Sequence, residues 1–516
     1  MNFLKAGMHK LPEYMQLRQA VESNALPAVA TGLSGIHKAT IINALVQDTN
    51  KTALLLAADE AEAQRICQDL TSMGLRSFIY PTRDFTFRNV ESASREYEHQ
   101  RIQVLSRILK HDCDVVVACM DAALQYTIPP NELEGRMIEL KKGQTVSLEQ
   151  VVQSLVRCGY VRAEQIDGTG QFAVRGGILD FFTPDAPYPV RIEFWGDEID
   201  TIGLFDLESQ RRTETVDAIM LAPSVEVLVD NPSELADKIE KHASSLRGKT
   251  APKAKEILQM ECDQLRNGRH FHCADKYITM LYDRTATLLD YFSLNDTLVF
   301  VSEFHKGKER IRTTQWQWAE DVKEYLEEGV LCRGLDTYSG DWIYIQSQLE
   351  KRSTVCLEAF VRGTYEVPVR TLLNITARQL SVWGGSIALL EEDLQAMQSS
   401  GLTCIVLGGT EKTASNIATD LKEKGLSVVY MPDMSEIPDK GVIITTGTLS
   451  AGMEFPAAGF GIITHGRHTG KAAAKKRKNK HAQELYSLSE LTVGDYIVHA
   501  SHGIGVFEGI HKINMQ

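Results

Sequence analysis

The stretch GLSGIHKA, residues 32–39, decides the fold class, because its spacing is that of a loop that binds phosphate. Its register matches G-x-x-x-x-G-K-[ST], a loop that follows a strand and opens a helix in nucleotide-binding α/β domains. His37 replaces the second defining glycine, and Ala39 replaces the hydroxyl that would bind Mg²⁺. The sequence therefore predicts a degenerate phosphate loop without a working nucleotide site. Its residues are Gly32, Gly35, His37, Lys38 and Ala39.

Short apolar runs and helical patterns alternate around this loop. Strands are predicted at residues 52–57, 77–80 and 114–118, and helices at 38–47, 60–73 and 94–108. Asp59 lies just past the first of these strands, and we expect it to cap the next helix rather than to bind Mg²⁺. This alternation is typical of a parallel sheet covered by helices.

The chain is too long for one hydrophobic core, since it has 516 residues and single cores stop growing at roughly 250 to 300. Later segments change from alternating strand patterns to helices and then to a second α/β rhythm that begins near Leu380. The predicted divisions are a degenerate P-loop α/β domain (1–130), a small α+β domain (131–212), a return with a helical region (213–350), a third α/β domain (351–466), a basic linker (467–484) and a short β-segment (485–516).

Composition limits the possible partners and compartments. The net charge of −13 argues against a surface wrapped by DNA. Residues 466–480, GRHTGKAAAKKRKNK, are basic without an acidic residue, and we interpret them as a solvated linker, with a nucleic-acid contact as the alternative. No apolar run is long enough to cross a bilayer, and the nine cysteines form no C-x-x-C pair, so a cytoplasmic protein is expected. The cluster Cys262, His270, His272 and Cys273 fits no ordinary zinc spacing, and no metal site is predicted.

Several arginines stand on or beside the predicted strands of the small α+β domain. In a sheet with one buried face, alternate residues point to solvent. Arg175, Arg191 and the nearby Arg162 could therefore line one exposed surface. Arginine is enriched among interface anchors because its planar fork pairs with carboxylates. A simply solvated role is the alternative.

Several motifs together resemble the N-terminal half of the bacterial transcription-repair coupling factor family, Mfd. They follow one another in the order of the family. They are the degenerate loop, RDF (83–85), SREYEHQR (94–101), FAVRGGILDFF (172–182), IEFWGDEIDTIGLFD (192–206), TTGTLSAGMEFP (445–456), the basic linker and GDYIVHASHGIGVFEGI (494–510).

The resemblance implies a UvrB-like module that has lost its ATPase, with residues 1–130 and 213–350 like UvrB domains 1A and 1B. It implies that residues 131–212 bind UvrA, through Arg162 in GYVR and Arg175 in VRGG. The last segment resembles the RNA-polymerase-interacting domain, a tudor-like barrel that meets the polymerase β subunit partly through an edge strand. The implied polymerase contacts are Val506, Phe507, Ile510 and Ile513.

This resemblance also sets what is not expected of the chain. The barrel is expected to be cut off at Gln516, and the motor domains of the family have no counterpart here. ATP, Mg²⁺ and most DNA contacts are therefore expected only of the full-length family protein, and no cofactor and no membrane partner are expected here.

Two functions remain open from the sequence. The first is an adaptor in transcription-coupled nucleotide excision repair that recruits UvrA and contacts stalled RNA polymerase. The alternative is a nucleotide-dependent DNA translocase or helicase-like ATPase that retains weak ATP binding through Lys38.

Overall fold

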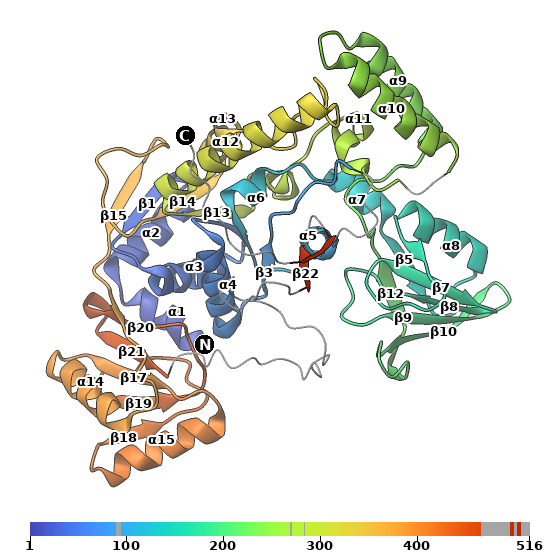
Figure 1. Ribbon diagram of the computed structural model, residues 1–516. Helices are drawn as coiled ribbons and strands as arrows, with labels where there is room; N and C mark the ends of the chain where they lie inside the picture. The colour runs from blue at the N-terminus through green and yellow to red at the C-terminus, as the bar shows by residue number, and fades with distance from the viewer. Residues whose placement is uncertain (89–93, 269–270, 283, 466–495, 500–502, 507–516) are drawn as a thin grey trace.

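The computed structural model describes the whole chain except residues 89–93, 269–270, 283, 466–495, 500–502 and 507–516. It is a mixed α/β structure with several sheets. A large parallel sheet occupies the middle, and an antiparallel-sheet domain, a helical arm and a third α/β unit surround it (Figure 1).

The central sheet has seven parallel strands in the order β15-β1-β14-β13-β2-β4-β3. Its strands are β1 (Ala28–Thr31), β2 (Thr52–Ala57), β3 (Ser77–Tyr80), β4 (Val115–Cys119), β13 (Thr297–Ser302), β14 (Ser353–Leu357) and β15 (Thr371–Asn374). Strands β1, β4 and β13 are buried along their whole length. This burial explains their continuous apolar runs, because helices cover both faces of a parallel sheet.

Three helices of this parallel-sheet domain overlap the helices predicted at residues 38–47, 60–73 and 94–108. The bounds predicted for β2, β3 and the helix after β2 are confirmed, and Asp59 caps that helix by accepting a hydrogen bond from the Glu62 N–H at 2.8 Å. The helices are α1 (Asn2–His9), α2 (Pro12–Glu22), α3 (Gly35–Thr49), α4 (Glu60–Met73), α5 (Glu96–Leu109), α6 (Met120–Leu124), α7 (Pro130–Arg136), α12 (Phe304–Glu328) and α13 (Trp342–Glu350).

An antiparallel-sheet domain is inserted between β4 and β13. Its six strands lie in the order β11-β10-β9-β8-β7-β6, and neighbouring strands are antiparallel except β6 and β7, which pair in parallel. A separate antiparallel ladder of β5 with β12 joins the start of the domain to its end. One face packs against helix α8, and Leu155 of this helix is fully buried. The elements are β5 (Ile138–Lys141), α8 (Leu148–Arg157), β6 (Val161–Arg162), β7 (Gln171–Arg175), β8 (Ile178–Phe181), β9 (Val190–Trp195), β10 (Glu198–Phe205), β11 (Arg212–Val216) and β12 (Ala218–Leu221).

The helical arm follows, and Figure 1 shows its two long helices projecting from the body. These are α9 (Pro232–Ser245) and α10 (Ala251–Arg266), which share a small apolar core. Shorter turns then lead back to β13: η1 (Ala274–Tyr277), α11 (Ile278–Leu281) and η2 (Leu288–Tyr291).

The third α/β unit begins later than the expected boundary at residue 351, because β14 and β15 lie in the central sheet. Its six strands have the order β16-β20-β21-β17-β19-β18. They are β16 (Arg378–Leu380), β17 (Thr403–Leu407), β18 (Val428–Tyr430), β19 (Val442–Thr445), β20 (Gly452–Phe455) and β21 (Phe460–Thr464), with α14 (Ile387–Ser399), α15 (Glu411–Glu423) and η3 (Pro456–Ala458).

Near the end of the chain, the described residues include one antiparallel hairpin, β22 (Tyr496–His499) with β23 (Gly503–Val506). A search of the described helices found none that is long and apolar enough to cross a membrane.

Candidate functional site

The loop at residues 32–35, between β1 and the start of α3, is closely covered by the chain that follows β15. Gly32 has a φ of +84°, and a Cβ atom there would lie 2.1 Å from the carbonyl oxygen of Ile375. The next residue, Leu33, donates its N–H to the Glu358 carbonyl at 3.1 Å. Only glycine suits this position, because it combines a left-handed backbone with a close main-chain contact.

His37 lies at the interface of this loop with the third α/β unit, and its side chain is almost fully buried. Its Nδ1 accepts the Ser34 N–H at 3.3 Å, and its Nε2 is 3.2 Å from the Arg378 carbonyl oxygen. The ring also meets the Phe455 ring edge to face, with centroids 5.2 Å apart. Burial lowers the pKa of His37 to about 4, so the imidazole is neutral at neutral pH.

Lys38 points into a buried cluster of acceptors beneath the loop. Its Nζ donates to Glu303 Oε1 at 2.7 Å, to Ser302 Oγ at 2.9 Å and to Glu62 Oε1 at 3.3 Å. Only 2% of the Lys38 side chain is exposed. These contacts match the three N–H donors of an ammonium group.

The remaining position of the motif offers no polar group. Ala39 is fully buried, and the following Thr40 turns its hydroxyl back to the Ile36 carbonyl at 2.9 Å. The hydroxyl of Thr40 therefore serves its own helix, and it contacts Met453 Sδ of β20 at 3.2 Å.

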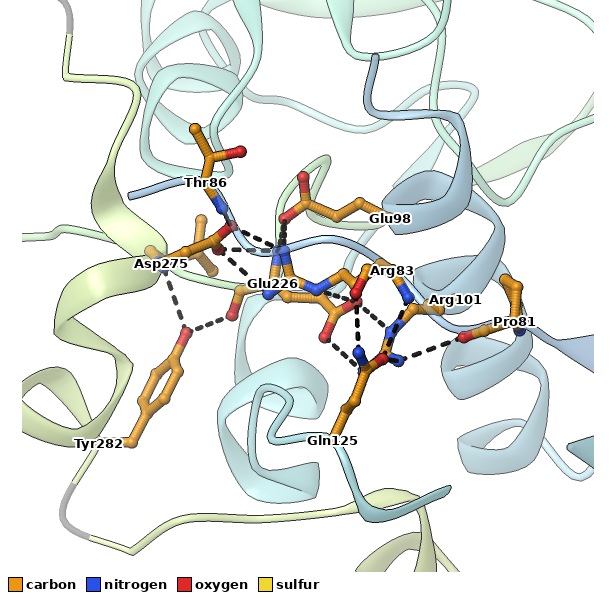
Figure 2. A network of polar contacts seen from close by, with 10 residues as sticks. Pro81, Arg83, Thr86, Glu98, Arg101, Gln125, Glu226, Asp275 and Tyr282 are labelled. Atoms are coloured by element: carbon orange, nitrogen blue, oxygen red, sulfur yellow. Dashed lines mark hydrogen bonds and ion pairs between the residues drawn. The ribbon is translucent and has the colours of Figure 1, made fainter. Parts of the chain in front are cut away.

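A buried network of charges joins three segments of the chain (Figure 2). Arg101 of α5 donates to both carboxylate oxygens of Glu226, at 2.6 and 3.2 Å. Arg83, in the loop after β3, binds both carboxylate oxygens of Asp275 in η1, with distances of 3.0 to 3.1 Å. Gln125 links the two arginines, since its Oε1 accepts from Arg101 at 2.7 Å and from the Arg83 N–H at 3.1 Å.

This joint, defined as Arg83, Arg101, Glu226 and Asp275, fixes where the inserted parts meet the central sheet. Glu226 lies on the segment that returns from the antiparallel-sheet domain, and Asp275 lies at the base of the helical arm. Burial acts to raise the pKa of Glu226, but the two arginines outweigh it and hold the pKa below its usual value. The sequence did not reveal Glu226 or Asp275 as the partners of these arginines, although Arg83 lies in RDF (83–85) and Arg101 in SREYEHQR (94–101).

The structure places Arg162 and Arg175 at the β6 edge of the antiparallel sheet. Both are exposed, and Arg175 donates to the main-chain carbonyl of Glu164 at 3.0 Å, two residues beyond Arg162. Arg162 lines a large cleft of about 2150 Å³ between this domain, the helices and loops of the parallel-sheet domain and the helical arm, and Arg175 does not line it. Among the described residues, neither arginine forms an ion pair.

Arg191 does not belong to this exposed surface, in contrast to the expectation. Its guanidinium makes two hydrogen bonds to the carboxylate of Asp180, at 2.7 and 2.8 Å, and lies over the Phe205 ring. This strand-to-strand pair is satisfied within the sheet, so Arg191 supports the domain rather than offering a free charge.

The residues expected to contact polymerase are only partly described. Val506 ends β23, pairs with Tyr496 and is 49% exposed. Phe507, Ile510 and Ile513 lie outside the described residues. Of the cysteine and histidine cluster, Cys262 and Cys273 are buried in the core of the helical arm and its base, and His270 lies outside the described residues.

Comparisons with known proteins agree with this architecture. Residues 138–226 match the UvrB interaction domain, and residues 491–516 match the CarD-like/TRCF RID domain. The first match covers the inserted antiparallel-sheet domain from β5 to the return segment that carries Glu226.

The relatives that match most of the chain are all transcription-repair-coupling factors. A transcription-repair-coupling factor of Bacillus subtilis is 28% identical over 501 residues, which are 94% of this chain and 42% of the relative. Those of Staphylococcus epidermidis and Staphylococcus aureus are 25% and 23% identical, with the same coverage. The chain thus spans less than half the length of these relatives. It is a relative of the transcription-repair-coupling factors that corresponds to the N-terminal half of these proteins.

Proposed function

We propose that this chain is the recruiting part of a transcription-repair coupling factor, which brings UvrA to RNA polymerase stalled on damaged DNA. The observation that carries this proposal is the match of residues 138–226 to the UvrB interaction domain, together with the exposed Arg162 and Arg175 at its edge. Their guanidinium groups suit a carboxylate-bearing protein surface, because each can pair bidentately.

UvrA binding tests the proposal directly. Calorimetric titration of UvrA into the parent chain should show saturable binding, and R162E/R175E should weaken it at least about tenfold, because each reversed charge meets a like charge at the contact. K142E/R211E is a matched control, since both residues are exposed on the same domain away from the β6 edge. Equal affinity of R162E/R175E and the parent would contradict the assigned site.

A contact with RNA polymerase is the second half of the proposal. It rests on the match of residues 491–516 to the CarD-like/TRCF RID domain and on the exposed end of β23. A strand edge of this kind can pair with a strand of a partner, and the polymerase β subunit is the proposed partner. V506P should weaken capture of the purified β subunit, because proline removes the N–H that a paired strand would use.

We also infer that the loop at residues 32–39 serves structure rather than nucleotide binding, which favours the adaptor over an ATPase. The geometry supports this inference: Lys38 is held by two carboxylates, His37 is packed against Phe455, and the main chain at Ile375 lies against Gly32. Equilibrium dialysis with Mg-ATP should therefore show no saturable binding at millimolar nucleotide. Saturable binding that K38M abolishes would instead support the weak ATPase.

A further inference from the structure

The tip of the helical arm carries a block of positive charge that none of the functions above uses. Residues 241–255, KHASSLRGKTAPKAK, form the end of α9, the connecting turn and the start of α10. All of them are described by the structure, and the block contains no acidic residue in a chain whose net charge is −13. Its five basic residues other than histidine are Lys241, Arg247, Lys249, Lys253 and Lys255.

The charges of this basic tip, defined as residues 241–255, are not neutralised by the arm itself. The carboxylates further along α9 are already paired, because Glu240 and Asp237 bind Arg266 and Glu234 binds Lys238. Within the described part of the chain, none of the five basic side chains at the tip forms an ion pair. Arg247 uses its Nη1 only for the main-chain carbonyls of Ser244 and Leu246, at 2.8 and 3.0 Å.

The shape of the tip gives an extended anion open access to these charges. The open part is the turn itself, where Arg247 and Lys249 flank the exposed Gly248 and nothing lies within 4 Å of its Cβ position. The start of α10, at Lys253 and Ala254, instead packs against Gly329 at the end of α12. Helix α10 begins at the tip without an acidic residue in its first turn and without a side-chain cap. The positive end of its dipole therefore adds to the same field.

We propose that the basic tip is a contact surface for the phosphate backbone of nucleic acid, with duplex DNA as the partner. Protein-binding surfaces are usually centred on buried aromatic or apolar anchors. Among residues 241–255, no large apolar side chain is exposed, so the tip offers charge without such an anchor. Charge without base-reading groups is the pattern of sequence-independent phosphate binding.

This surface is distinct from the proposed UvrA and polymerase contacts, because it lies on α9 and α10 rather than on the antiparallel sheet or β23. It would let the chain touch DNA near the partners that it joins, and it does not depend on those partners.

Fluorescence anisotropy of a labelled duplex of about 25 base pairs, measured over a range of KCl concentrations, tests the proposal. The parent should bind, and its logarithmic affinity should fall linearly with the logarithm of salt concentration. K241Q/R247Q/K249Q should bind at least about tenfold more weakly at low salt, and its slope should be shallower by about 3, since each lost phosphate contact reduces the slope by about 1.

Two controls separate this surface from others. The first is K475Q/K476Q/R477Q, which removes the same charge from the basic linker and should retain the part of the duplex affinity that the basic tip contributes. The second is circular dichroism, in which melting curves that match the parent should show that both variants are folded. The proposal is overturned if the parent does not bind DNA or if the tip variant keeps the slope of the parent. It is also overturned if polyglutamate, at equal concentration of charge, displaces the duplex as well as unlabelled DNA does, because the surface then prefers acidic protein.

Discussion

Lys38 occupies the position of the lysine in the phosphate-loop pattern, but its contacts are those of a buried structural residue. In a working loop this lysine would reach the β- and γ-phosphates, but here its ammonium group lies between Glu62 and Glu303, at 3.3 and 2.7 Å. Glu303 has a left-handed backbone with φ of 48° and also accepts the Ala359 N–H at 2.8 Å. Lysine therefore ties the helix after β1 to the ends of β13 and β14.

K38M should destabilise the chain by about 3 to 5 kcal/mol, because removing one partner of a buried ion pair leaves the other charge uncompensated. Guanidinium unfolding of the parent and K38M gives this difference in free energy. The exposed Lys142 provides the control, since K142M should leave the midpoint unchanged. An unchanged midpoint for K38M would show that the carboxylates do not depend on this cation.

His37 should make the stability depend on pH. Its folded-state pKa is lowered to about 4 from an ordinary value of 6.5, because the ring is buried. The unfolded chain therefore takes up the proton first as pH falls, so the contribution is fully present above the unfolded pKa and is lost between pH 6.5 and about 4. The loss amounts to at most about 3 kcal/mol.

H37Q isolates this contribution, because glutamine suits the third helical position of a capping box and does not titrate in this range. We expect the free energy of unfolding to fall less for H37Q than for the parent between about pH 7 and about pH 4.5. His99, whose pKa burial also lowers to about 4, acts equally in both proteins. Identical pH profiles of the two proteins would mean that His37 is accessible to protons when folded.

At the scale of elements, the sequence correctly predicted those helices and strands whose bounds are set by interactions between residues close together in the chain. The run TALLLA followed by Asp59 gave β2 and α4 with correct bounds, because burial and a helix cap act within a few residues. The predicted boundary at residue 351 assigned the segment of β14 and β15 to the third α/β domain, whereas both strands lie in the central sheet. Which strands pair in a parallel sheet depends on contacts between distant segments. Few residues of helix α12 are fully buried over its 25 positions, and several of its core contacts are made by partly buried side chains such as Trp318, Val322 and Tyr325.

For the candidate site too, the sequence identified the residues of the local motif but not their distant partners. The motif itself identified His37, Lys38 and Ala39, but not the acceptors that surround Lys38. Ser302 and Glu303 lie 264 and 265 positions away along the chain. Arg83 and Asp275 are likewise 192 positions apart. Such pairs follow from the topology of the whole chain and leave no signal in either neighbourhood.

At the scale of the whole molecule, the joint of Arg83, Arg101, Glu226 and Asp275 connects the inserted parts to the parallel-sheet domain. The antiparallel-sheet domain and the helical arm are both insertions into the central sheet, and the joint contacts the return segment of one and the base of the other (Figure 2). Arg101 and Glu226 are both fully buried. Because the low-dielectric surroundings strengthen a satisfied network, the joint should hold the proposed UvrA-binding edge in one orientation.

R101M should therefore loosen this orientation as well as destabilise the protein by about 3 to 5 kcal/mol, since Glu226 then loses its main partner. Spin labels at Q64C on α4 and W195C on β9 can report the distance between the two parts, because both positions are exposed and every native cysteine is buried. Electron–electron resonance should give one narrow distance distribution for the parent and a broader one for R101M.

The exposed pair of Arg76 with Asp112 and Asp114 provides the matched control, since it lies within the parallel-sheet domain. R76M should keep the narrow distribution and nearly the parental stability, because exposed ion pairs contribute at most about 1 kcal/mol. R101M/E226M then separates charge from geometry: removing both partners should recover much of the stability, because two apolar side chains leave no buried charge. If R101M keeps the parental distance distribution while losing stability, the joint supports folding only, and the orientation of the antiparallel-sheet domain is set by its other contacts.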